Sequence, residues 1–390
     1  MKIIVYCQHV LGVGHFFRIL EICRALSHHQ VIMVTGGDDL PVALPEHVHQ
    51  VRLPGLMMDE RFERLSAIDA ALSLETVKAR RREMLGALFQ REAADLFLIE
   101  LFPFGRKAFR FELEPVLEGI SQGRLPKCRV VCSLRDILVE KEKKSHEQQA
   151  LETLQRNFDL LLVHADPAVV RLEETFGLAS RITIPVIYTG FVTPFPEPGI
   201  RETLRRRLGL TDQQRLVVVS AGGGKVGVDL MHAFVAAFGT TAAQVDGLRG
   251  VLFTGPYLAK AQVQKLKRHA PQGLLIQHFS TEFLNYLAAA DLSVSMAGYN
   301  TCMNMLAARV PALVLPFDQN REQAMRAQRL AVLGAVEILR PDDLTPSRLA
   351  QRMIDLLLHP PAVVRYPNLE GAVQTVRELE ALAGSHHRQP

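Results

Sequence analysis

The sequence predicts two α/β domains, each built on a parallel sheet with helices on both faces. Two observations lead to this prediction. A short β-branched run, a glycine-containing turn and a segment with apolar residues three and four apart follow one another repeatedly, as in βα units. This series also starts twice along the chain. With 390 residues, 48% of them apolar and 22% charged, the chain is long enough for two or three cores, and its composition argues against disorder.

The first series contains six expected strands, enough for one complete sheet. These strands are expected at Lys2–Cys7, Val31–Thr35, Val48–Leu53, Leu96–Leu101, Arg129–Ser133 and Leu160–His164. The second series contains another five and a short piece. They are expected at Leu216–Ser220, Val251–Thr254, Leu274–Gln277, Leu292–Ser295, Ala312–Pro316 and near Glu337–Leu339.

A connector separates the two series. Thr193–Gly199 contains three prolines, which disfavour a continuing helix and suit an extended segment. We therefore expect a first domain at 1–192, a linker at 193–199, a second domain at 200–370, and a C-terminal helix with a frayed tail at 371–390. Ligands of open parallel sheets bind at the carboxyl ends of the strands, so the function is expected in a cleft between the two sheets.

Composition excludes several functional classes. The net charge of +4 is small, aromatic residues make up only 6%, and the runs Arg80–Arg82 and Arg205–Arg207 are interpreted as solvated helix faces, so nucleic-acid binding has weak support. No apolar stretch approaches the roughly 20 residues of a membrane span, and the chain begins with a strand rather than a secretory signal. Five scattered cysteines suit a reducing cytoplasm, and no zinc spacing accompanies Cys128 and Cys132, so no metal site is expected.

The first glycine turn follows the first strand. Gly12 and Gly14 remove side chains where main-chain N–H groups at a helix start could face an anion or the hydroxyls of a substrate. An ordinary tight turn explains the two glycines about as well. His15 falls in the first turn of the helix, where the dipole lowers its pKa and favours a neutral imidazole able to accept a proton.

The second half opens with a similar turn. Gly222, Gly223 and Gly224 let the main chain approach a phosphate, and Lys225 could add positive charge. The loop is not a Walker loop, because Val226 stands where that motif needs Ser or Thr.

A third turn follows the strand that ends at Ser295. The run Ser295-Met296-Ala297-Gly298-Tyr299-Asn300-Thr301 places small and hydroxyl-bearing residues at a helix start, where they suit a diphosphate. Asn304, one turn further on, could reach a ribose or could simply face solvent.

The first half also supplies candidates for a base and for acceptor binding. Glu100 ends an apolar strand and Arg135-Asp136 follows another, so all three should lie at the carboxyl edge of one sheet. Glu100 could instead pair with Arg106, and Arg135 could pair with Asp136. The aromatic and cationic segment Phe102–Phe111 could dock on a membrane, although an apolar helix face with charges opposite is favoured.

At this point the chain resembles a known family. The phrase Ser-x-Ala-Gly-x-x-Thr, followed by Val310-Pro311-Ala312-Leu313-x-x-Pro316-Phe317, resembles the MurG-like glycosyltransferases of the GT-B fold. Gly298–Thr301 and Arg321-Glu322-Gln323 resemble, more closely, a bacterial group of predicted glycosyltransferases. The resemblance runs from Val10 to about Gly334 and is most specific in the second half.

The resemblance implies roles for these residues. It implies two Rossmann-like, doubly wound domains facing across a cleft, with His15 near the reacting sugar and acceptor, and Gly222–Gly224 near the donor phosphates. The loop Gln277-His278-Phe279-Ser280 would read the uracil base. Ser295, Ala297, Gly298, Tyr299, Asn300 and Thr301 would form the diphosphate turn, and Glu322 and Gln323 would hold the hydroxyls of the donor sugar. The family has a ribose-binding Glu where this chain has Asn304, and a neutral amide lacks the charge-assisted bond of a carboxylate.

We therefore expect a cytoplasmic enzyme that transfers a sugar from a UDP-linked donor to an acceptor hydroxyl with inversion. A peripheral position on the inner face of the membrane is the other location that this interpretation allows. The expected base is His15 or Glu100. The residues expected on the acceptor side are Gly12, Gly14, Arg106, Arg135 and Asp136. Neither a metal nor another cofactor is expected to take part. The acceptor could be a small molecule, a glycan or a lipid-linked sugar. An epimerase or hydrolase on the same fold and a non-catalytic sugar-nucleotide-binding protein are the alternatives, the latter because of Asn304.

Overall fold

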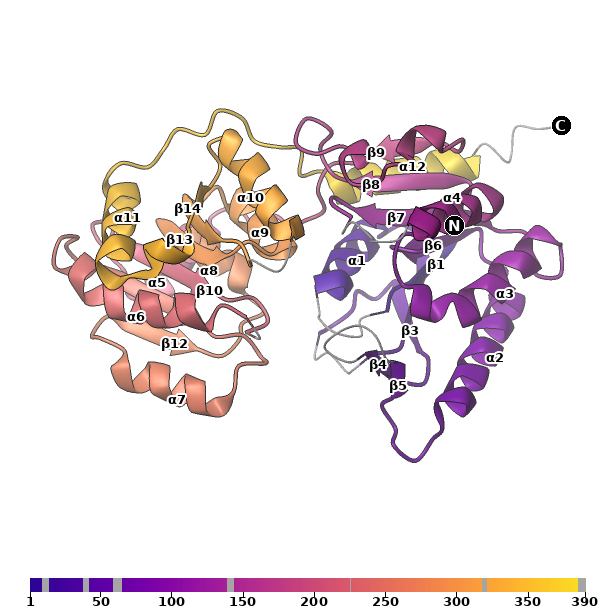
Figure 1. Ribbon diagram of the computed structural model, residues 1–390, viewed down its shortest axis with the longest axis horizontal. Coiled ribbons are helices and arrows are strands. Elements are labelled where there is room, and N and C mark those ends of the chain that lie inside the picture. Colours follow the sequence, from indigo (N-terminus) through magenta and orange to yellow (C-terminus); the bar gives the residue numbers. More distant parts are fainter. Residues whose placement is uncertain are drawn as a thin grey trace. The chain divides into compact units, whose positions relative to one another are not determined.

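A computed structural model describes residues 1–8, 14–37, 42–58, 65–138, 144–224, 226–317 and 321–384. The chain divides into two compact units (Figure 1). The first comprises Met1–Val192 together with Asn368–Pro390, and the second comprises Thr193–Pro367. The expected second domain ran to residue 370, with a separate helix and tail after it. In the structure the second unit ends at Pro367, and the C-terminal helix belongs to the first unit. The residues 385–390 of the expected frayed tail lie outside the described part.

The first unit contains a seven-stranded parallel sheet with the order β3-β2-β1-β6-β7-β8-β9. Its strands are β1 (Lys2–Tyr6), β2 (Gln30–Thr35), β3 (Val48–Arg52), β6 (Leu96–Glu100), β7 (Arg129–Arg135), β8 (Leu160–His164) and β9 (Val186–Tyr188). The six expected strands are all present, and β9 was not expected. A small antiparallel pair, β4 (Leu56–Met58) and β5 (Leu65–Ala67), was not expected either.

Helices cover both faces of this sheet. On one face α1 (Gly14–Ala25) and α12 (Gly371–Gly384) pack with Ile3 and Val5 of β1 and with Cys7, which follows this strand. On the other face lie α2 (Leu74–Glu92) and α3 (Arg110–Ser121), and Phe89 of α2 stacks edge-on against Phe97 of β6. The unit also contains α4 (Lys144–Asn157) and the short turns η1 (Lys107–Phe109), η2 (Leu172–Glu174) and η3 (Ala179–Arg181).

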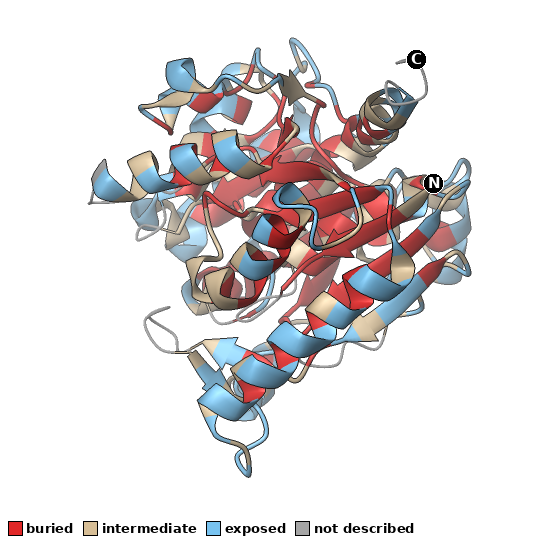
Figure 2. Ribbon diagram, turned by 90° about the vertical axis from the view of Figure 1, so that its right-hand side faces the viewer, coloured by how far each residue is buried: buried red, intermediate tan, exposed pale blue. Residues whose placement is uncertain are grey.

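The second unit contains a six-stranded parallel sheet with the order β12-β11-β10-β13-β14-β15. Its strands are β10 (Leu216–Ser220), β11 (Arg249–Phe253), β12 (Leu274–Gln277), β13 (Leu292–Met296), β14 (Ala312–Leu315) and β15 (Glu337–Ile338). Its helices are α5 (Ile200–Arg207), α6 (Val228–Ala242), α7 (Lys260–His269), α8 (Phe283–Ala289), α9 (Tyr299–Ala308), α10 (Arg321–Val332), η4 (Pro341–Leu344) and α11 (Pro346–Leu358). All six expected strands of this half are present. Figure 2 shows strands that are buried and helices that are buried on one side and exposed on the other.

Both sheets reverse their strand order beside the first strand. The chain moves outward from β1 to β3 and then returns to β6 on the other side of β1, and it repeats this path around β10 and β13. Such a reversal leaves a crevice at the carboxyl ends of the two central strands, where doubly wound sheets bind ligands. The residues of interest therefore follow β1 and β6 in the first unit, and β10 and β13 in the second.

The two segments of the first unit that flank the second unit in the sequence are hydrogen-bonded to each other. Phe191 N–H donates to the carbonyl of Asn368 at 2.8 Å, and Gly371 N–H donates to the carbonyl of Phe191 at 3.0 Å. A side chain on Gly371 would meet the carbonyl oxygen of Gly190 at 2.4 Å, so only glycine allows this close approach. The Asp166 carboxylate also accepts the Asn368 N–H at 2.9 Å.

The segment Phe102–Phe111 turns aromatic side chains inward, in keeping with the favoured interpretation of an apolar face. Phe102, Phe104 and Phe109 are buried, and Phe104 stacks edge-on against Phe176 at 5.0 Å between ring centroids. These three aromatic rings form part of the core. Within the described residues no helix is both long enough and apolar enough to cross a membrane.

The two arginine runs are also only partly solvated. Arg80 and Arg82 are exposed as expected, but Arg81 is fully buried and binds Glu112 through two nitrogens, at 2.8 and 2.6 Å. Arg205 is buried as well and binds Asp291 at 3.1 Å together with main-chain carbonyls. One position of each run, the middle one in the first run and the first one in the second, faces the interior, where a carboxylate distant in sequence compensates its charge.

Candidate functional site

His15 and Glu100 lie together at the carboxyl edge of the first sheet. Glu100 is the last residue of β6, and His15 is the second residue of α1, which follows β1. The Nδ1 atom of His15 lies 2.5 Å from Oε1 of Glu100. The Glu100 side chain is fully buried, whereas the His15 side chain is 24% exposed. Of the two predicted bases, therefore, only His15 can meet a substrate directly.

Two arginines compensate the buried carboxylate. Arg18, one turn after His15, donates from Nη2 to Oε1 of Glu100, and Arg106 approaches Oε2 at 3.4 Å. The pairing with Arg106 is the alternative that the sequence left open for Glu100. Both Leu101 and Arg106 have positive φ, 66° and 56°, so the main chain after Glu100 is held in a conformation that non-glycine residues rarely adopt.

This environment decides the protonation states. Burial lowers the pKa of His15 to about 3, with Glu100 acting against this shift and Arg106 and Arg18 acting with it. Burial would raise the pKa of Glu100, but His15 and the two guanidinium groups outweigh it and hold that pKa well below its usual value. At neutral pH the pair is thus a neutral imidazole on an ionised carboxylate. An imidazole that donates from Nδ1 keeps its lone pair at Nε2, where it can accept a proton.

A second histidine lies deeper in the same sheet. The ring of His164, the last residue of β8, is within hydrogen-bond distance of the Ser133 hydroxyl (2.7 Å) and of the Thr189 hydroxyl (2.8 Å). All three residues are fully buried, and burial lowers the pKa of His164 to about 3, assisted by Arg18. Both ring nitrogens therefore have partners, and this neutral histidine is a structural element.

The glycine loop after β10 is held by main-chain contacts. Gly222 and Gly224 have positive φ, 64° and 85°. A Cβ on Gly224 would lie 2.3 Å from the Thr254 carbonyl oxygen, and one on Gly255 would lie 2.4 Å from that of Gly222. Glycine is therefore required for the loop after β10 to pack on the loop after β11. Gly222 and Gly223 are exposed, so their main chain is accessible to a ligand.

The turn after β13 leads directly into α9. Gly298 is its N-cap and is partly exposed, and no described atom lies within 4 Å of a Cβ built on it. The first turn of any helix has main-chain N–H groups without carbonyl partners inside the helix, and these attract anions. Asn300 and Thr301 in this turn are partly exposed, whereas Tyr299 is buried.

Two residues predicted for this turn lie in the interior. Ser295 is fully buried within β13, with its hydroxyl 3.1 Å from that of Ser293. Ala297 is fully buried, and its carbonyl accepts from Arg326 at 3.3 Å. Ser295 thus serves the core rather than a ligand, because the strand continues to Met296 and turns this side chain inward.

The other predicted donor residues have protein partners. Asn304 accepts through Oδ1 from the Thr193 hydroxyl at 3.1 Å, and Gln323 accepts through Oε1 from the Phe317 N–H at 3.1 Å. Glu322 is buried, with Arg326 3.8 Å away on the next turn of α10. Gln323 therefore holds the main chain at Phe317, two residues after the end of β14, and one face of the Asn304 amide is already occupied.

The loop after β12 combines a structural residue and an exposed one. Ser280 accepts the Glu282 N–H through its hydroxyl at 3.0 Å and so helps to start α8. Phe279 is 47% exposed. Of these two predicted base-loop residues, Phe279 is the one that presents a large surface to a ligand.

The remaining acceptor-side candidates differ in accessibility. Arg135 is partly exposed and Asp136 is buried, while Gly14 is the first residue of α1. Gly12 and Lys225 lie outside the described residues. Sequence reasoning missed Arg18, although its place three residues after His15 puts both on one helix face. It also missed Thr193 and Tyr257, for which the sequence carries no local signal.

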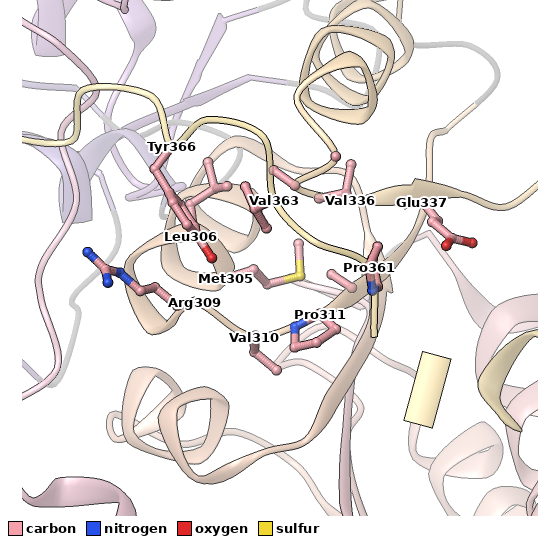
Figure 3. A pocket seen from close by; sticks show the side chains of 13 residues that line it. Met305, Leu306, Arg309, Val310, Pro311, Val336, Glu337, Pro361, Val363 and Tyr366 are labelled. Atoms are coloured by element: carbon pink, nitrogen blue, oxygen red, sulfur yellow. The ribbon is translucent and has the colours of Figure 1, made fainter. Parts of the chain in front are cut away.

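A small pocket in the second unit lies away from these residues. Its volume is about 70 Å³, and it is lined mainly by apolar side chains at the end of α9 and at the starts of β14 and β15. Figure 3 shows Met305 and Val363 facing into it, with the charged ends of Arg309 and Glu337 directed outward. It lies at the amino ends of the strands, opposite the glycine turns. Across the described residues, no group of three or more His, Cys, Asp or Glu side chains is placed to hold a metal ion.

Comparison with known proteins gives the second half of the chain a family likeness. Residues 218–379 match the glycosyltransferase family 28 C-terminal domain. One relative is the UDP-N-acetylglucosamine–N-acetylmuramyl-(pentapeptide) pyrophosphoryl-undecaprenol N-acetylglucosamine transferase of Carboxydothermus hydrogenoformans, to which the chain is 27% identical over 192 residues. The aligned region covers 49% of this chain and 51% of that protein. The chain thus spans about half the length of the curated relatives that it matches.

Solved structures extend the likeness to the whole chain. MurG of Acinetobacter baumannii is 17% identical and superposes with a TM-score of 0.55, covering all of both chains. The glycosyltransferase VinC, solved in complex with dTDP, is 15% identical with a TM-score of 0.62, over 99% of this chain and 100% of that one. At these identities the likeness shows the fold, which is GT-B, with two parallel-sheet α/β domains.

Proposed function

Since the chain is MurG-like in its second domain and has the GT-B fold, we propose that it is a glycosyltransferase that uses a nucleotide-diphosphate sugar. The observation that carries the proposal is the pair of His15 and Glu100 at the strand-order reversal of the first sheet. A neutral imidazole held by a buried, ionised carboxylate is a general base, and glycosyl transfer to a hydroxyl requires one.

His15 is the base, and Glu100 is its positioning residue. The Glu100 carboxylate holds the ring through Nδ1, and Arg18 and Arg106 keep that carboxylate ionised and in place. As the imidazole accepts the hydroxyl proton and becomes positive, the adjacent carboxylate stabilises the new charge. This division of roles follows from burial, because Glu100 cannot itself reach a substrate.

The second domain binds the donor. Its diphosphate sits on the N–H groups at the start of α9 and beside the exposed main chain of Gly222 and Gly223, which supply positive potential without a metal ion. In the transfer the acceptor oxygen forms a bond to the anomeric carbon, its proton passes to Nε2 of His15, and the bond from that carbon to the diphosphate oxygen breaks. The attack comes from the face opposite the leaving diphosphate, so the configuration inverts.

The donor is proposed to be uridine-linked, and transfer to be independent of added divalent metal. The experiment incubates the full chain with UDP-, dTDP-, GDP- and ADP-linked sugars and a panel of acceptor hydroxyl compounds, with and without EDTA. Release of nucleoside diphosphate that depends on an acceptor, and that His15→Ala abolishes, supports transfer. Neither binding nor release with any donor would overturn it.

The same assay distinguishes the alternatives. Diphosphate release that no acceptor changes indicates hydrolysis or elimination, and donor binding without any turnover indicates a non-catalytic binding protein. In either case His15→Ala would leave binding to the second domain unaffected, because the two sites are in separate units.

A further inference from the structure

A polar pocket lies between two neighbouring helices of the first unit, α3 and α4 (Figure 1). Its volume is about 190 Å³, below the roughly 300–1,000 Å³ of pockets that hold drug-sized ligands, so it suits a small occupant. The lining side chains of α3 stand four residues apart and therefore share one face of that helix. None of the lining residues has a role in the proposed transfer. They include Arg110, Glu114 and Glu118 of α3, and Glu152, Arg156 and Asn157 of α4.

Arg110 carries donors that the protein does not use. Its Cζ atom lies 5.8 Å from the centre of the Phe102 ring, and its side chain is only 18% exposed. Its Nη1 atom binds Glu114 at 3.1 Å, whereas Nε and Nη2 are buried without a hydrogen-bond partner among the described residues. Buried donors of a charged group are costly to leave unpaired, so a ligand that accepts from them would bind favourably.

Asn157 brings an unused acceptor to the same pocket. Its Nδ2 atom donates to the Thr153 carbonyl at 3.0 Å, but its Oδ1 atom is buried and accepts from no group of the described residues. The ring of Phe158, the next residue, lies 6.4 Å from the ring of Phe102, against which Arg110 packs. The unused acceptor and the unused donors therefore belong to neighbouring parts of one pocket.

The charges of the lining residues disfavour simple ions. An inorganic anion would suit the arginines but would meet the carboxylates of Glu114, Glu118 and Glu152, whereas a cation would meet the arginines. A hydroxyl group both donates and accepts, so it can pair with a guanidinium, a carboxylate or an amide oxygen. The lining thus suits a small neutral molecule that carries several hydroxyls.

We propose that the pocket between α3 and α4 binds a neutral sugar ring, at a site separate from the one where transfer takes place. Arg110 donates to ring hydroxyls through Nε and Nη2, Asn157 accepts from one through Oδ1, and the Glu118 carboxylate accepts from another. The occupant is a free sugar or one unit of a longer glycan. This site does not rest on the proposed function, because it requires no donor nucleotide and none of the residues around His15.

The test titrates the full chain by calorimetry with glucose, galactose, mannose and N-acetylglucosamine, and with a disaccharide of each. Inorganic phosphate and spermidine serve as the ionic probes. At least one sugar should bind, and neither ionic probe should bind in the pocket. Tighter binding of the disaccharide identifies the occupant as a unit of a glycan, and equal affinities identify it as a free sugar.

Arg110→Met removes the guanidinium and keeps an unbranched stem against Phe102. It should weaken the sugar at least about tenfold, as expected for hydrogen bonds from a charged group. It should leave the free energy of unfolding nearly unchanged, because two of the donors that it removes have no partner in the protein. Asn157→Leu, which removes the acceptor, should weaken the sugar as well.

Arg124→Met is the matched control, because Arg124 is an exposed arginine shortly after α3 that does not line the pocket. It should leave the sugar affinity within twofold. If Arg110→Met does not fold, Asn157→Leu takes its place. Failure of every sugar to bind, or sugar binding that the pocket variants leave unchanged, overturns the proposal. Binding of phosphate or spermidine that Arg110→Met abolishes overturns it too, because the pocket would then be an ion site.

Discussion

The Nδ1 atom of His15 lies 2.5 Å from the Glu100 carboxylate, and the two residues differ in exposure. His15 is partly exposed, whereas Glu100 is fully buried and its negative charge is compensated by Arg18 and Arg106. It separates two roles that residue type alone could not separate, because either side chain can act as a base.

Replacement of His15 tests the exposed role. His15→Ala should lower the rate of transfer about 10²- to 10⁴-fold, the usual contribution of a general base. Affinity for nucleoside diphosphates, measured by calorimetry, should not change. A variant that transfers sugar at the original rate would exclude His15 as the base.

Replacement of Glu100 has a different signature. Glu100→Gln leaves Arg18 and Arg106 with a neutral partner in the interior, so the free energy of unfolding should fall by about 3–5 kcal/mol. The rate should fall as well, because the imidazole loses its anionic support. Denaturant unfolding measures the first effect, and initial rates on the folded fraction measure the second. A loss of rate without a loss of stability would contradict the buried ion-pair role.

Acid should destabilise the protein through His164. Burial lowers its pKa from 6.5 to about 3, so between these values the unfolded chain binds a proton that the folded chain does not. The contribution of the neutral His164 to the free energy of unfolding is therefore fully present above about pH 6.5 and is lost as the pH falls toward 3. His164→Gln, which does not titrate, should show a shallower decline of the urea midpoint between pH 7.5 and 5. Equal slopes in the two proteins would show that His164 is not involved.

The amide of Asn304 should limit the affinity for ribonucleotides. Asn304→Glu can still accept from the Thr193 hydroxyl, and it adds a charged acceptor for a ribose hydroxyl. UDP affinity should then rise about tenfold, and dTDP, which lacks the 2′-hydroxyl, should gain less. Thr193→Val, which removes the hydroxyl partner, serves as the control. Weaker binding of both nucleotides by Asn304→Glu would contradict this prediction.

The arginine runs provide a matched pair of variants. Arg81→Ala leaves the buried carboxylate of Glu112 without its cation and should cost about 3–5 kcal/mol in unfolding free energy. Arg82→Ala, at the next and exposed position of α2, should change it by less than about 0.5 kcal/mol. Comparable effects of the two substitutions would contradict the buried position of Arg81.

Glycines of the second unit provide another pair. Gly224→Ala would hold an alanine at a positive φ and place its Cβ 2.3 Å from the Thr254 carbonyl oxygen. The substitution should therefore lower the free energy of unfolding by about 1–3 kcal/mol and weaken pyrophosphate binding. Gly239 lies within α6, where no described atom is within 4 Å of an added Cβ, so Gly239→Ala should stabilise by about 0.5–1 kcal/mol. Both values come from urea unfolding, and a stabilising Gly224→Ala would contradict the close packing of the loop.

The sequence predicted the strands of both sheets well, because β-branched runs and the glycine turns after them are local patterns. It did not predict that α12 returns to the first unit, or that Arg81 binds Glu112, because these contacts join distant segments. In the site, His15 and Glu100 could be placed at one sheet edge, but the burial of Glu100 depends on Arg18 and the turn at Arg106. Ser295 was assigned to a ligand because hydroxyls suit phosphates, and only the length of β13 shows that it points inward.

The return of α12 makes the first domain discontinuous along the chain. During synthesis on the ribosome, the face of α1 that packs against α12 is made early, and its partner emerges only after all of Thr193–Pro367. Leu379, fully buried in that core, is thus added long after the side chains that enclose it. The packing of α12 onto the first domain must therefore wait until the second has been translated, and in the interval the apolar face of α1 has no α12 to cover it.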